Sequence, residues 1–235
     1  QMSNALGTVT DAKRIIELAH AANVPVLLDG CQGAVHMATD VQNLDVDFYV
    51  FSGHKVYGPG GIGVMYAKAQ LLETMRPYRG GGEMIRDVTL DDVTYADPPH
   101  RFEAGTPPIV EAIGLGAALD YMTAIGWDNI TAHERALADH AMDVVGGINR
   151  VQIFGTTPDK GAIVSFIVDG IHPHDLAMVM DRAGVAVRAG HHCAQPLMKR
   201  FDVPATARAS FAIYNTHEEV EALGAALNNA IAFFG

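Results

Sequence analysis

The sequence predicts an α/β protein in which a mostly parallel sheet is followed by a smaller α/β domain. Short apolar runs alternate with amphipathic stretches along the chain, an order of elements typical of α/β folds. The first run, VPVLLD at 24–29, is continuously apolar, as expected of a strand buried on both faces of a parallel sheet. Turns rich in Gly and Pro separate several of these runs, which indicates short strands.

The first part of the chain is predicted to contain one helix and three strands. The helix spans 11–22, with Thr10 as its N-cap and an apolar stripe that includes Ile16. The strands are predicted at 24–29, 47–52 and 62–67. The segment GHKVYGPGG, between the last two strands, contains too much Gly and Pro for regular structure. A glycine-rich loop, RGGGE at 79–83, follows.

The second part begins within a long helical region at 108–145, which we expect to break near Gly126. Beyond it, strands are predicted at 151–155, 162–168, 184–189 and 207–213, and helices at 173–183 and 217–234. This alternation indicates a small α/β domain whose sheet is covered on one side. We therefore place the domain boundary near residue 125, between residues 1–125 and residues 126–235.

Composition excludes several classes of partner. The chain has 235 residues, of which 49% are hydrophobic and 18% charged, as in a folded globular protein. Its formal net charge is −11, without a clustered basic run, so nucleic acid and anionic membranes are poor partners. No apolar run is long enough to span a bilayer. Two cysteines are too few for a disulfide framework, which predicts a reduced, cytoplasmic protein.

The segment SGHKVYGPGGIG at 52–63 is the strongest candidate for chemistry. Lys55 follows a buried strand directly, and desolvation there would favour the free amine that forms Schiff bases. Asp29 ends another strand and could hold a ring nitrogen protonated, while Ser52 and His54 could bind a phosphate. As structural alternatives, Lys55 is an exposed loop lysine and Asp29 only caps a turn. Together the four residues are consistent with a pyridoxal-phosphate site.

The segment RAGHHCAQPLM at 188–198 leaves three roles open for Cys193, which are metal ligand, nucleophile and small core residue. We expect no metal, because adjacent residues rarely reach one tetrahedral ion together and no CxxC or HxxxH spacing supplies a fourth ligand. His191 and His192 could lower the pKa of the thiol if they faced it. The other cysteine, Cys31, is expected to be a packing residue.

Five segments decide between these roles by their resemblance to a known family. They are VLLDGCQGAVH, DFYVFSGHKVYGPGGIGV, RFEAGTP, RAGHHCAQPLM and RASFAIYNTHEEV. In this order they resemble the cysteine desulfurases of the class V aminotransferase family, in the group typified by the SufS and CsdA proteins. The resemblance covers essentially the whole chain. It implies the large domain of a fold type I pyridoxal-phosphate enzyme, incomplete here, and a small C-terminal domain.

The resemblance also implies a role for each matching residue. Lys55 would form the Schiff base with pyridoxal phosphate and Cys193 would be the nucleophile. The cofactor would further be bound by Asp29, Gln32, Ser52, His54 and Asn4, and Thr106 would reach the phosphate of the neighbouring subunit. Arg208, with Arg188 nearby, would hold the substrate carboxylate, and Asn4 would orient the substrate as well as the cofactor. The expected reaction converts L-cysteine to L-alanine and leaves a persulfide on Cys193, for delivery to a SufE- or SufU-like acceptor in iron-sulfur cluster assembly.

Two alternatives to this reading remain. One is a selenocysteine lyase, which uses the same residues without so strict a need for Cys193. The other is a catalytically incompetent fragment or dimerisation scaffold, since the family's phosphate loop and the imidazole that stacks on the cofactor do not precede Asn4 in this chain. We expect the complete protein to be a homodimeric desulfurase, and this chain alone to bind the cofactor weakly or not at all.

Overall fold

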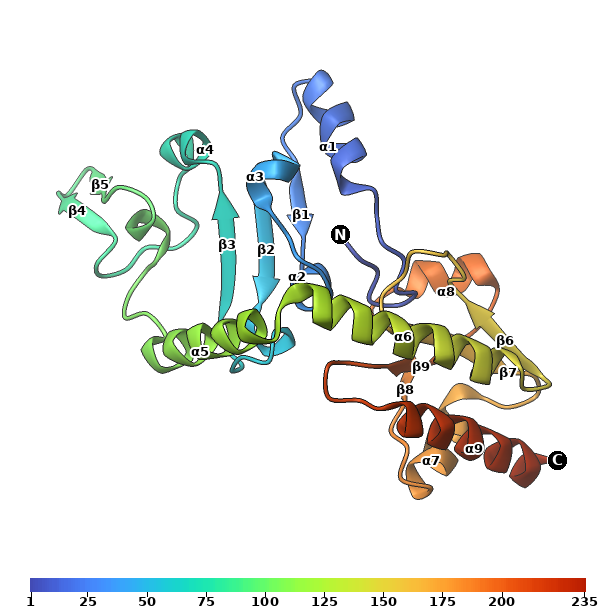
Figure 1. Cartoon of the computed structure of the whole chain (residues 1–235). Coiled ribbons are helices and arrows are strands. Elements are labelled where there is room, and N and C mark those ends of the chain that lie inside the picture. Colours follow the sequence, from blue (N-terminus) through green and yellow to red (C-terminus); the bar gives the residue numbers. More distant parts are fainter. The chain divides into compact units, whose positions relative to one another are not determined.

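The computed structural model describes all residues from 1 to 235, and their contacts divide the chain into two compact units. The first unit consists of Gln1 and residues 11–125, and the second of residues 2–10 and 126–235 (Figure 1). The two long helices are separated at Gly126, as the sequence predicts, and Gly126 has a φ of +88° that favours glycine.

Residues 2–10 differ from the expected division, which put them with residues 11–125. Within the second unit, Ser165 donates a hydrogen bond from its hydroxyl to the main-chain oxygen of Ala5, and Thr8 forms a β-bridge with Lys160. Segment 2–10 lacks the periodicity of a helix or strand, so no local pattern separates it from the helix that follows.

The first unit is built around a three-stranded sheet of order β1-β2-β3. Its elements are α1 (Ala12–Ala21), β1 (Leu27–Asp29), α2 (Gly33–His36), α3 (Val41–Leu44), β2 (Phe48–Ser52), η1 (Gly53–Lys55), β3 (Gly63–Ala67), α4 (Ala69–Thr74), β4 (Ile85–Val88), β5 (Val93–Tyr95), η2 (His100–Phe102) and α5 (Ile109–Ile125). The helix α1 is capped by the Asp11 side chain, which accepts from the Arg14 main-chain N–H at 3.1 Å, and not by Thr10 as predicted.

This sheet is mixed, whereas the sequence predicted mostly parallel pairing. The strands β1 and β2 are parallel, with Asp29 opposite Val50, but β3 runs antiparallel to β2. The connection between β2 and β3 is only a short turn, and a parallel pair would need a crossover of a dozen or more residues. The predicted α/β class is nevertheless confirmed, and the three predicted strands are present.

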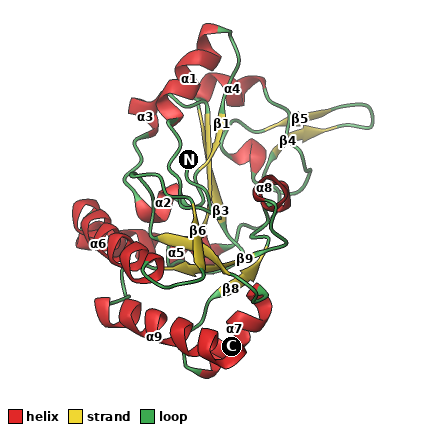
Figure 2. Cartoon of the chain, turned by 90° about the vertical axis from the view of Figure 1, so that its right-hand side faces the viewer, coloured by secondary structure: helices red, strands yellow, loops and turns green.

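The second unit contains a four-stranded antiparallel sheet of order β6-β7-β9-β8. Its elements are α6 (Trp127–Gly146), β6 (Val151–Phe154), β7 (Ile163–Val168), α7 (Pro173–Arg182), β8 (Arg188–Gly190), α8 (Gln195–Phe201), β9 (Thr206–Ser210) and α9 (His217–Phe234). The last helix begins with a capping box between Thr216 and Glu219. Figure 2 shows the helices of this unit in red and its strands in yellow.

The alternation of side chains along β7 separates the two faces of this sheet. Val164, Phe166 and Val168 lie in one apolar core with residues of α6, α7 and α9. Ser165 points to the opposite face, where it bonds segment 2–10. Arg208 is opposite Ser165 in the β7–β9 register, so both side chains emerge on the face that carries segment 2–10. One face of the sheet is thus core, and the other carries polar residues with potential for chemistry.

Taken singly, each helix is too short or too polar to cross a membrane, and only the bent pair of α5 and α6 meets the length and composition criteria when the two are combined.

Candidate active site

In the first unit, Asp29 and Ser52 lie where two parallel strands end. Asp29 is the last residue of β1 and Ser52 the last of β2, so their side chains share the carboxyl edge of the sheet, the usual ligand side of such sheets. The main-chain N–H of Cys31 donates to Asp29 Oδ1 at 2.8 Å. This hydrogen bond, with a smaller contribution from the positive charge of Lys55, holds the pKa of Asp29 below its usual value. Asp29 is therefore ionised at neutral pH.

Lys55 lies directly after Ser52, in the short 3₁₀ turn η1. The turn is compact because the carbonyl of Gly53 accepts from the N–H groups of both Val56 and Gly58. A Cβ on Gly53 would come within 2.7 Å of an Ile62 side-chain carbon, so only glycine fits. Lys55 is half-buried, whereas its neighbour His54 is exposed. The tight turn presents the lysine amine beside the strand edge.

The remaining candidates of the first unit have less defined surroundings. Gln32 is half-buried and precedes α2 without capping it. The thiol of Cys31 lies 3.6 Å from the hydroxyl of Ser52, close enough for a weak hydrogen bond. Thr106 is exposed in the segment that leads into α5. Neither Gln32 nor Thr106 has an environment that identifies a role by itself.

The donor set at this edge fits pyridoxal phosphate, the cofactor that the resemblance implies. An ionised carboxylate suits a protonated ring nitrogen, an amine suits a Schiff base, and a hydroxyl suits a phosphate oxygen. Asp29 and Ser52 supply the carboxylate and the hydroxyl from the ends of two neighbouring strands, and Lys55 supplies the amine from the turn that follows Ser52. The close backbone packing that follows Asp29, where a Cβ on Gly30 would clash with the ring of Tyr49, fixes the direction of the chain there.

In the second unit, Cys193 lies in the loop between β8 and α8. Its thiol is free and its residue is exposed. The loop borders a cavity of about 450 Å³, which is lined by Arg188, Ala189, His191, His192, Cys193, Gln195 and Pro196. His192 and Cys193 both have positive φ angles, of 53° and 59°. An accessible thiol next to a cavity of this size can react with a small substrate or with a partner's thiol.

Two arginines accompany this cysteine on neighbouring strands. Arg188 on β8 and Arg208 on β9 are directly opposite in the sheet register. Arg208 is half-buried, its Nη1 donates to the main-chain oxygen of Asn4 at 2.6 Å, and its buried Nε has no hydrogen-bond partner. Burial and then the charge of Arg188 lower the pKa of Arg208, whereas Cys193 acts in the opposite direction. An unsatisfied guanidinium N–H is what a substrate carboxylate would bind.

The two histidines before Cys193 occupy different environments. His191 is exposed and lines the cavity, whereas His192 is only 1% exposed. Its Nε2 lies 2.9 Å from the hydroxyl and 3.2 Å from the carbonyl oxygen of Thr206. Burial, followed by the charge of Arg208, lowers the pKa of His192 to about 4. His192 is therefore neutral at pH 7 and is an anchor of the loop, not a charged neighbour of the thiol.

The predicted site residues thus fall into two sets. Asp29, Gln32, Ser52, His54, Lys55 and Thr106 belong to the first unit. Asn4, Arg188, Cys193 and Arg208 belong to the second. Thr206 was missed by sequence reasoning, although its position two residues before Arg208 on one strand places both on the same face.

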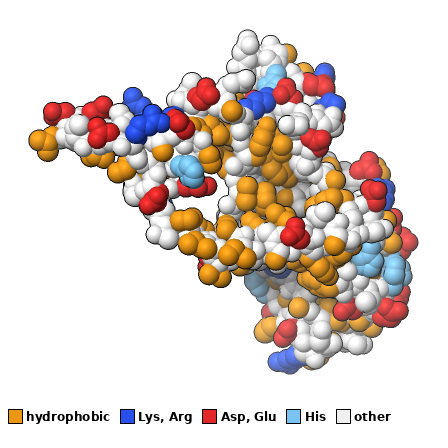
Figure 3. Space-filling view, turned by 60° about the vertical axis from the view of Figure 1, so that its left-hand side comes forward, with side chains coloured by type: hydrophobic (Ala, Val, Ile, Leu, Met, Phe, Trp, Pro, Cys, Tyr) orange, Lys and Arg blue, Asp and Glu red, His pale blue; other side chains and the backbone are white.

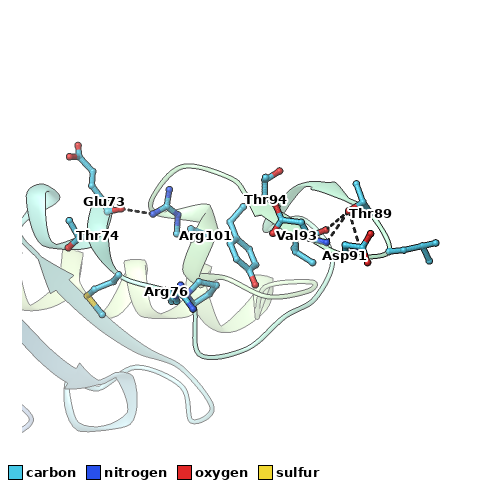
Figure 4. Close-up of a pocket in the computed structure, with 13 residues that line it drawn as sticks. Glu73, Thr74, Arg76, Thr89, Asp91, Val93, Thr94 and Arg101 are labelled. Atoms are coloured by element: carbon cyan, nitrogen blue, oxygen red, sulfur yellow. Dashed lines mark hydrogen bonds between the residues drawn. The ribbon is translucent and has the colours of Figure 1, made fainter.

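A further cavity of the structure contains none of the residues predicted for the active site. Figure 4 shows a cavity of about 770 Å³ in the first unit, between the end of α4 and the β4–β5 hairpin. There Arg101 donates to the main-chain oxygen of Glu73 at 2.9 Å. No group of three or more His, Cys, Asp or Glu side chains is arranged to hold a metal ion.

Comparison with known proteins identifies the family. The model of the aminotransferase class-V family matches residues 1–223. A cysteine desulfurase of Synechococcus elongatus is 52% identical over 97% of this chain, which corresponds to 36% of that protein. A probable cysteine desulfurase of Halalkalibacterium halodurans is 51% identical over 100% of this chain and 57% of its own length. The chain therefore spans roughly a third to just over half the length of these relatives.

Solved structures agree with this assignment. The crystal structure of the cysteine desulfurase CsdA from Escherichia coli matches with a TM-score of 0.95 and 43% identity, over 99% of this chain and 58% of that one. A mutant of the protein C-DES, with glycine covalently linked to its PLP cofactor, matches with a TM-score of 0.81 and 25% identity, over 95% and 57% of the two chains. The fold, the family model and the relatives agree, and the chain belongs to the aminotransferase class-V family.

Proposed function

We propose that the complete protein is a pyridoxal-phosphate-dependent cysteine desulfurase, which converts L-cysteine to L-alanine and takes the sulfur onto Cys193 as a persulfide. The observation that carries this proposal is the loop of the second unit, where an exposed thiol borders a cavity lined by Arg188, and Arg208 lies opposite Arg188 in the sheet with a buried Nε that lacks a partner. A thiol nucleophile next to a carboxylate-binding guanidinium suits an amino acid that carries its reactive sulfur two carbons from the carboxylate.

The residues of the first unit would hold the cofactor. Lys55 would bind it covalently, ionised Asp29 would keep its ring nitrogen protonated, and Ser52 with His54 would bind the phosphate. Gln32 of this unit, and Asn4 of the second unit, would orient it. Bound pyridoxal phosphate supplies an electron sink for the pair released at the substrate Cα. The amine of Lys55, once free, would carry the Cα proton.

The residues of the second unit would bind the substrate and receive its sulfur. Arg208 would hold the substrate carboxylate, with Arg188 adding positive charge. The thiolate of Cys193 would attack the substrate sulfur, so that an S–S bond forms as the bond between sulfur and Cβ breaks. The electron pair of the broken bond would remain on carbon, which takes up a proton to give L-alanine.

We further propose that the enzyme is a cytoplasmic homodimer, in which Thr106 reaches the cofactor phosphate of the neighbouring subunit, and that a SufE- or SufU-like protein accepts the sulfur. The free state of both cysteines supports a reducing compartment.

Incubation of the complete protein with pyridoxal phosphate and L-cysteine tests the function. We expect stoichiometric L-alanine and a Cys193 peptide heavier by one sulfur atom, both measured by mass spectrometry. Formation of alanine without sulfur on Cys193 would contradict the proposed nucleophile. The selenocysteine lyase alternative is tested by turnover of L-cysteine and L-selenocysteine after Cys193→Ala, because loss of only the activity with L-cysteine would indicate a desulfurase that also accepts selenium.

The fragment alternative needs a separate measurement on this chain. We expect the 235-residue chain alone to bind pyridoxal phosphate weakly or not at all. A stable absorbance of lysine-bound cofactor that Lys55→Ala abolishes would contradict this expectation.

A further inference from the structure

The loop that carries Cys193 adopts a backbone conformation that its residues do not favour. His192 and Cys193 follow one another with φ angles of 53° and 59°. L-residues avoid this left-handed region because Cβ approaches the backbone too closely, and two in succession are rarer still. Such a conformation persists only where surrounding contacts impose it, and it occurs most often at functional sites.

One such contact comes from Asn4. Its Nδ2 donates to the main-chain oxygen of His192 at 2.7 Å. This oxygen belongs to the peptide group that joins His192 to Cys193. The hydrogen bond therefore fixes the plane of the peptide group directly before the proposed nucleophile. Because a carbonyl oxygen only accepts hydrogen bonds, the Asn4 amide must turn its NH₂ group toward the loop.

A second contact comes from the His192 side chain. Its Nε2 is within hydrogen-bonding distance of both the hydroxyl and the carbonyl oxygen of Thr206. The hydroxyl can donate to or accept from Nε2, depending on the tautomer of the imidazole, whereas the carbonyl oxygen can only accept. The imidazole and Thr206 are both almost fully buried, so the histidine ties the loop to strand β9 beneath it.

Asn4 is itself held rigidly on the sheet. Its main-chain oxygen accepts from Arg208 Nη1, and the next residue, Ala5, accepts from the buried hydroxyl of Ser165. One residue therefore contacts the loop of Cys193 through its side chain and Arg208 through its main chain. The nucleophile and the guanidinium are positioned against the same short segment of chain.

We propose that Asn4 and His192 are positioning residues, which together clamp the His192–Cys193 peptide in its left-handed conformation and so aim the thiol relative to Arg208. This inference rests on the proposed function for the role of Cys193, but the clamp itself concerns only the second unit. It is additional to the part that the family resemblance implies for Asn4, because only the amide NH₂ contacts the loop.

Hydrogen exchange tests the clamp without any catalytic assay. In the 235-residue chain, Asn4→Ala and the nearly isosteric Asn4→Asp both remove the NH₂ donor. We expect amide exchange in the peptide covering 190–195 to become about three- to tenfold faster, as for the loss of one hydrogen bond. Exchange in β7 (Ile163–Val168) should stay unchanged, which shows that the unit remains folded.

Ser3→Ala is the matched control for these variants. The Ser3 hydroxyl accepts from the N–H groups of Ala5 and Leu6 in the same segment, at 3.3 and 3.1 Å, and is not bonded to the loop. The clamp is overturned if Asn4→Asp exchanges like the parent, or if Ser3→Ala accelerates the loop as much as Asn4→Ala does.

Thr206→Val tests the second contact and separates positioning from mere stability. In the complete protein we expect kcat for alanine formation to fall about tenfold or more, as for a misplaced reacting group, with KM for L-cysteine within about twofold of the parent. Thr206→Ser, which retains the hydroxyl, should restore kcat. Equal kcat in Thr206→Val and the parent would overturn the role of His192. If the parent itself lacks activity, the proposed function fails, and the exchange data alone then decide on the clamp.

Discussion

The two units bury their apolar side chains to very different extents. In the second unit, residues from α6, β7, α7, β9 and α9 form one continuous core in which Leu137, Phe166 and Leu227 are completely buried. The core around β1 and β2 in the first unit contains Ile16, Val46 and Tyr49 as buried members, and Val56, Met84 and Met122 are buried elsewhere in that unit. Large apolar side chains there stay exposed, as on α5, where Val110 is 78% and Ile113 71% exposed. Figure 3 shows such hydrophobic side chains in orange.

This difference concerns function because each unit carries one half of the proposed chemistry. The nucleophile and Arg208 belong to the unit with the larger core, and the cofactor-binding residues belong to the unit with the smaller one. Burial of apolar area is the main stabilising contribution to folding. We therefore expect the second unit, with the loop of Cys193, to stay folded at urea concentrations that already unfold the first unit, with Asp29 and Lys55.

The largest effects should separate the two halves by their chemistry. In the complete protein, Lys55→Ala and Cys193→Ser should each lower desulfurase turnover by at least about a thousandfold, because each removes a group that forms a covalent bond. Only Lys55→Ala should also remove the absorbance of lysine-bound cofactor. Spectra and alanine assays on both variants check this, and loss of the absorbance in Cys193→Ser would contradict the division of roles.

Core truncation should act on one unit only. Leu227→Ala removes a completely buried side chain from the core of the second unit, which should cost about 2–5 kcal/mol of unfolding free energy through lost burial and the remaining cavity. Urea titration followed by hydrogen exchange would resolve the units. We expect earlier exchange in β7 and β9, with unchanged exchange in β1 and β2. A single shared transition for all four strands would show that the units unfold together and would contradict this prediction.

Much of this arrangement could be predicted from the sequence, and the exceptions have physical causes. Apolar runs and turn residues are local signals, so the strands that end in Asp29 and Ser52 were recognised. Segment 2–10 contains no such signal, and its attachment to the second unit depends on Ser165 and Lys160, more than a hundred residues away. The environment of His192 could not be predicted either, because adjacent histidines look equivalent in a sequence. Only the sheet register places Thr206 beneath one of them.

The pH dependence of stability should single out the second unit. The pKa of His192 is lowered in the folded unit to about 4 from an ordinary value of 6.5, so between these pH values the unfolded chain binds one proton more. Stability is therefore complete above pH 6.5 and decreases as the pH falls toward 4, by up to about 3 kcal/mol at 1.36 kcal/mol per pKa unit. Urea unfolding of the second unit at pH 7 and pH 4.5 would measure the loss.

A matched pair of variants assigns this dependence to the right histidine. His192→Gln should abolish the part of the loss that arises between pH 6.5 and 4, because glutamine does not titrate. His191→Gln changes the exposed neighbour instead and should leave the loss in place. If both variants behave alike, the buried imidazole is not its source.

The smallest effect tests the backbone conformation at the nucleophile, and it has an unusual sign. Glycine normally destabilises a folded chain relative to alanine, because it loses more freedom on folding. At Cys193, where φ is 59°, Cys193→Gly should instead be more stable than Cys193→Ala by about 1 kcal/mol, since only glycine adopts this region without strain. The control is Ala225→Gly on the exposed side of α9, which should lose about 1 kcal/mol. Thermal unfolding of the second unit measures both differences. If Cys193→Gly were less stable than Cys193→Ala, Cys193 would not be held in the left-handed conformation. The proposal that Asn4 and His192 impose this conformation would then be wrong.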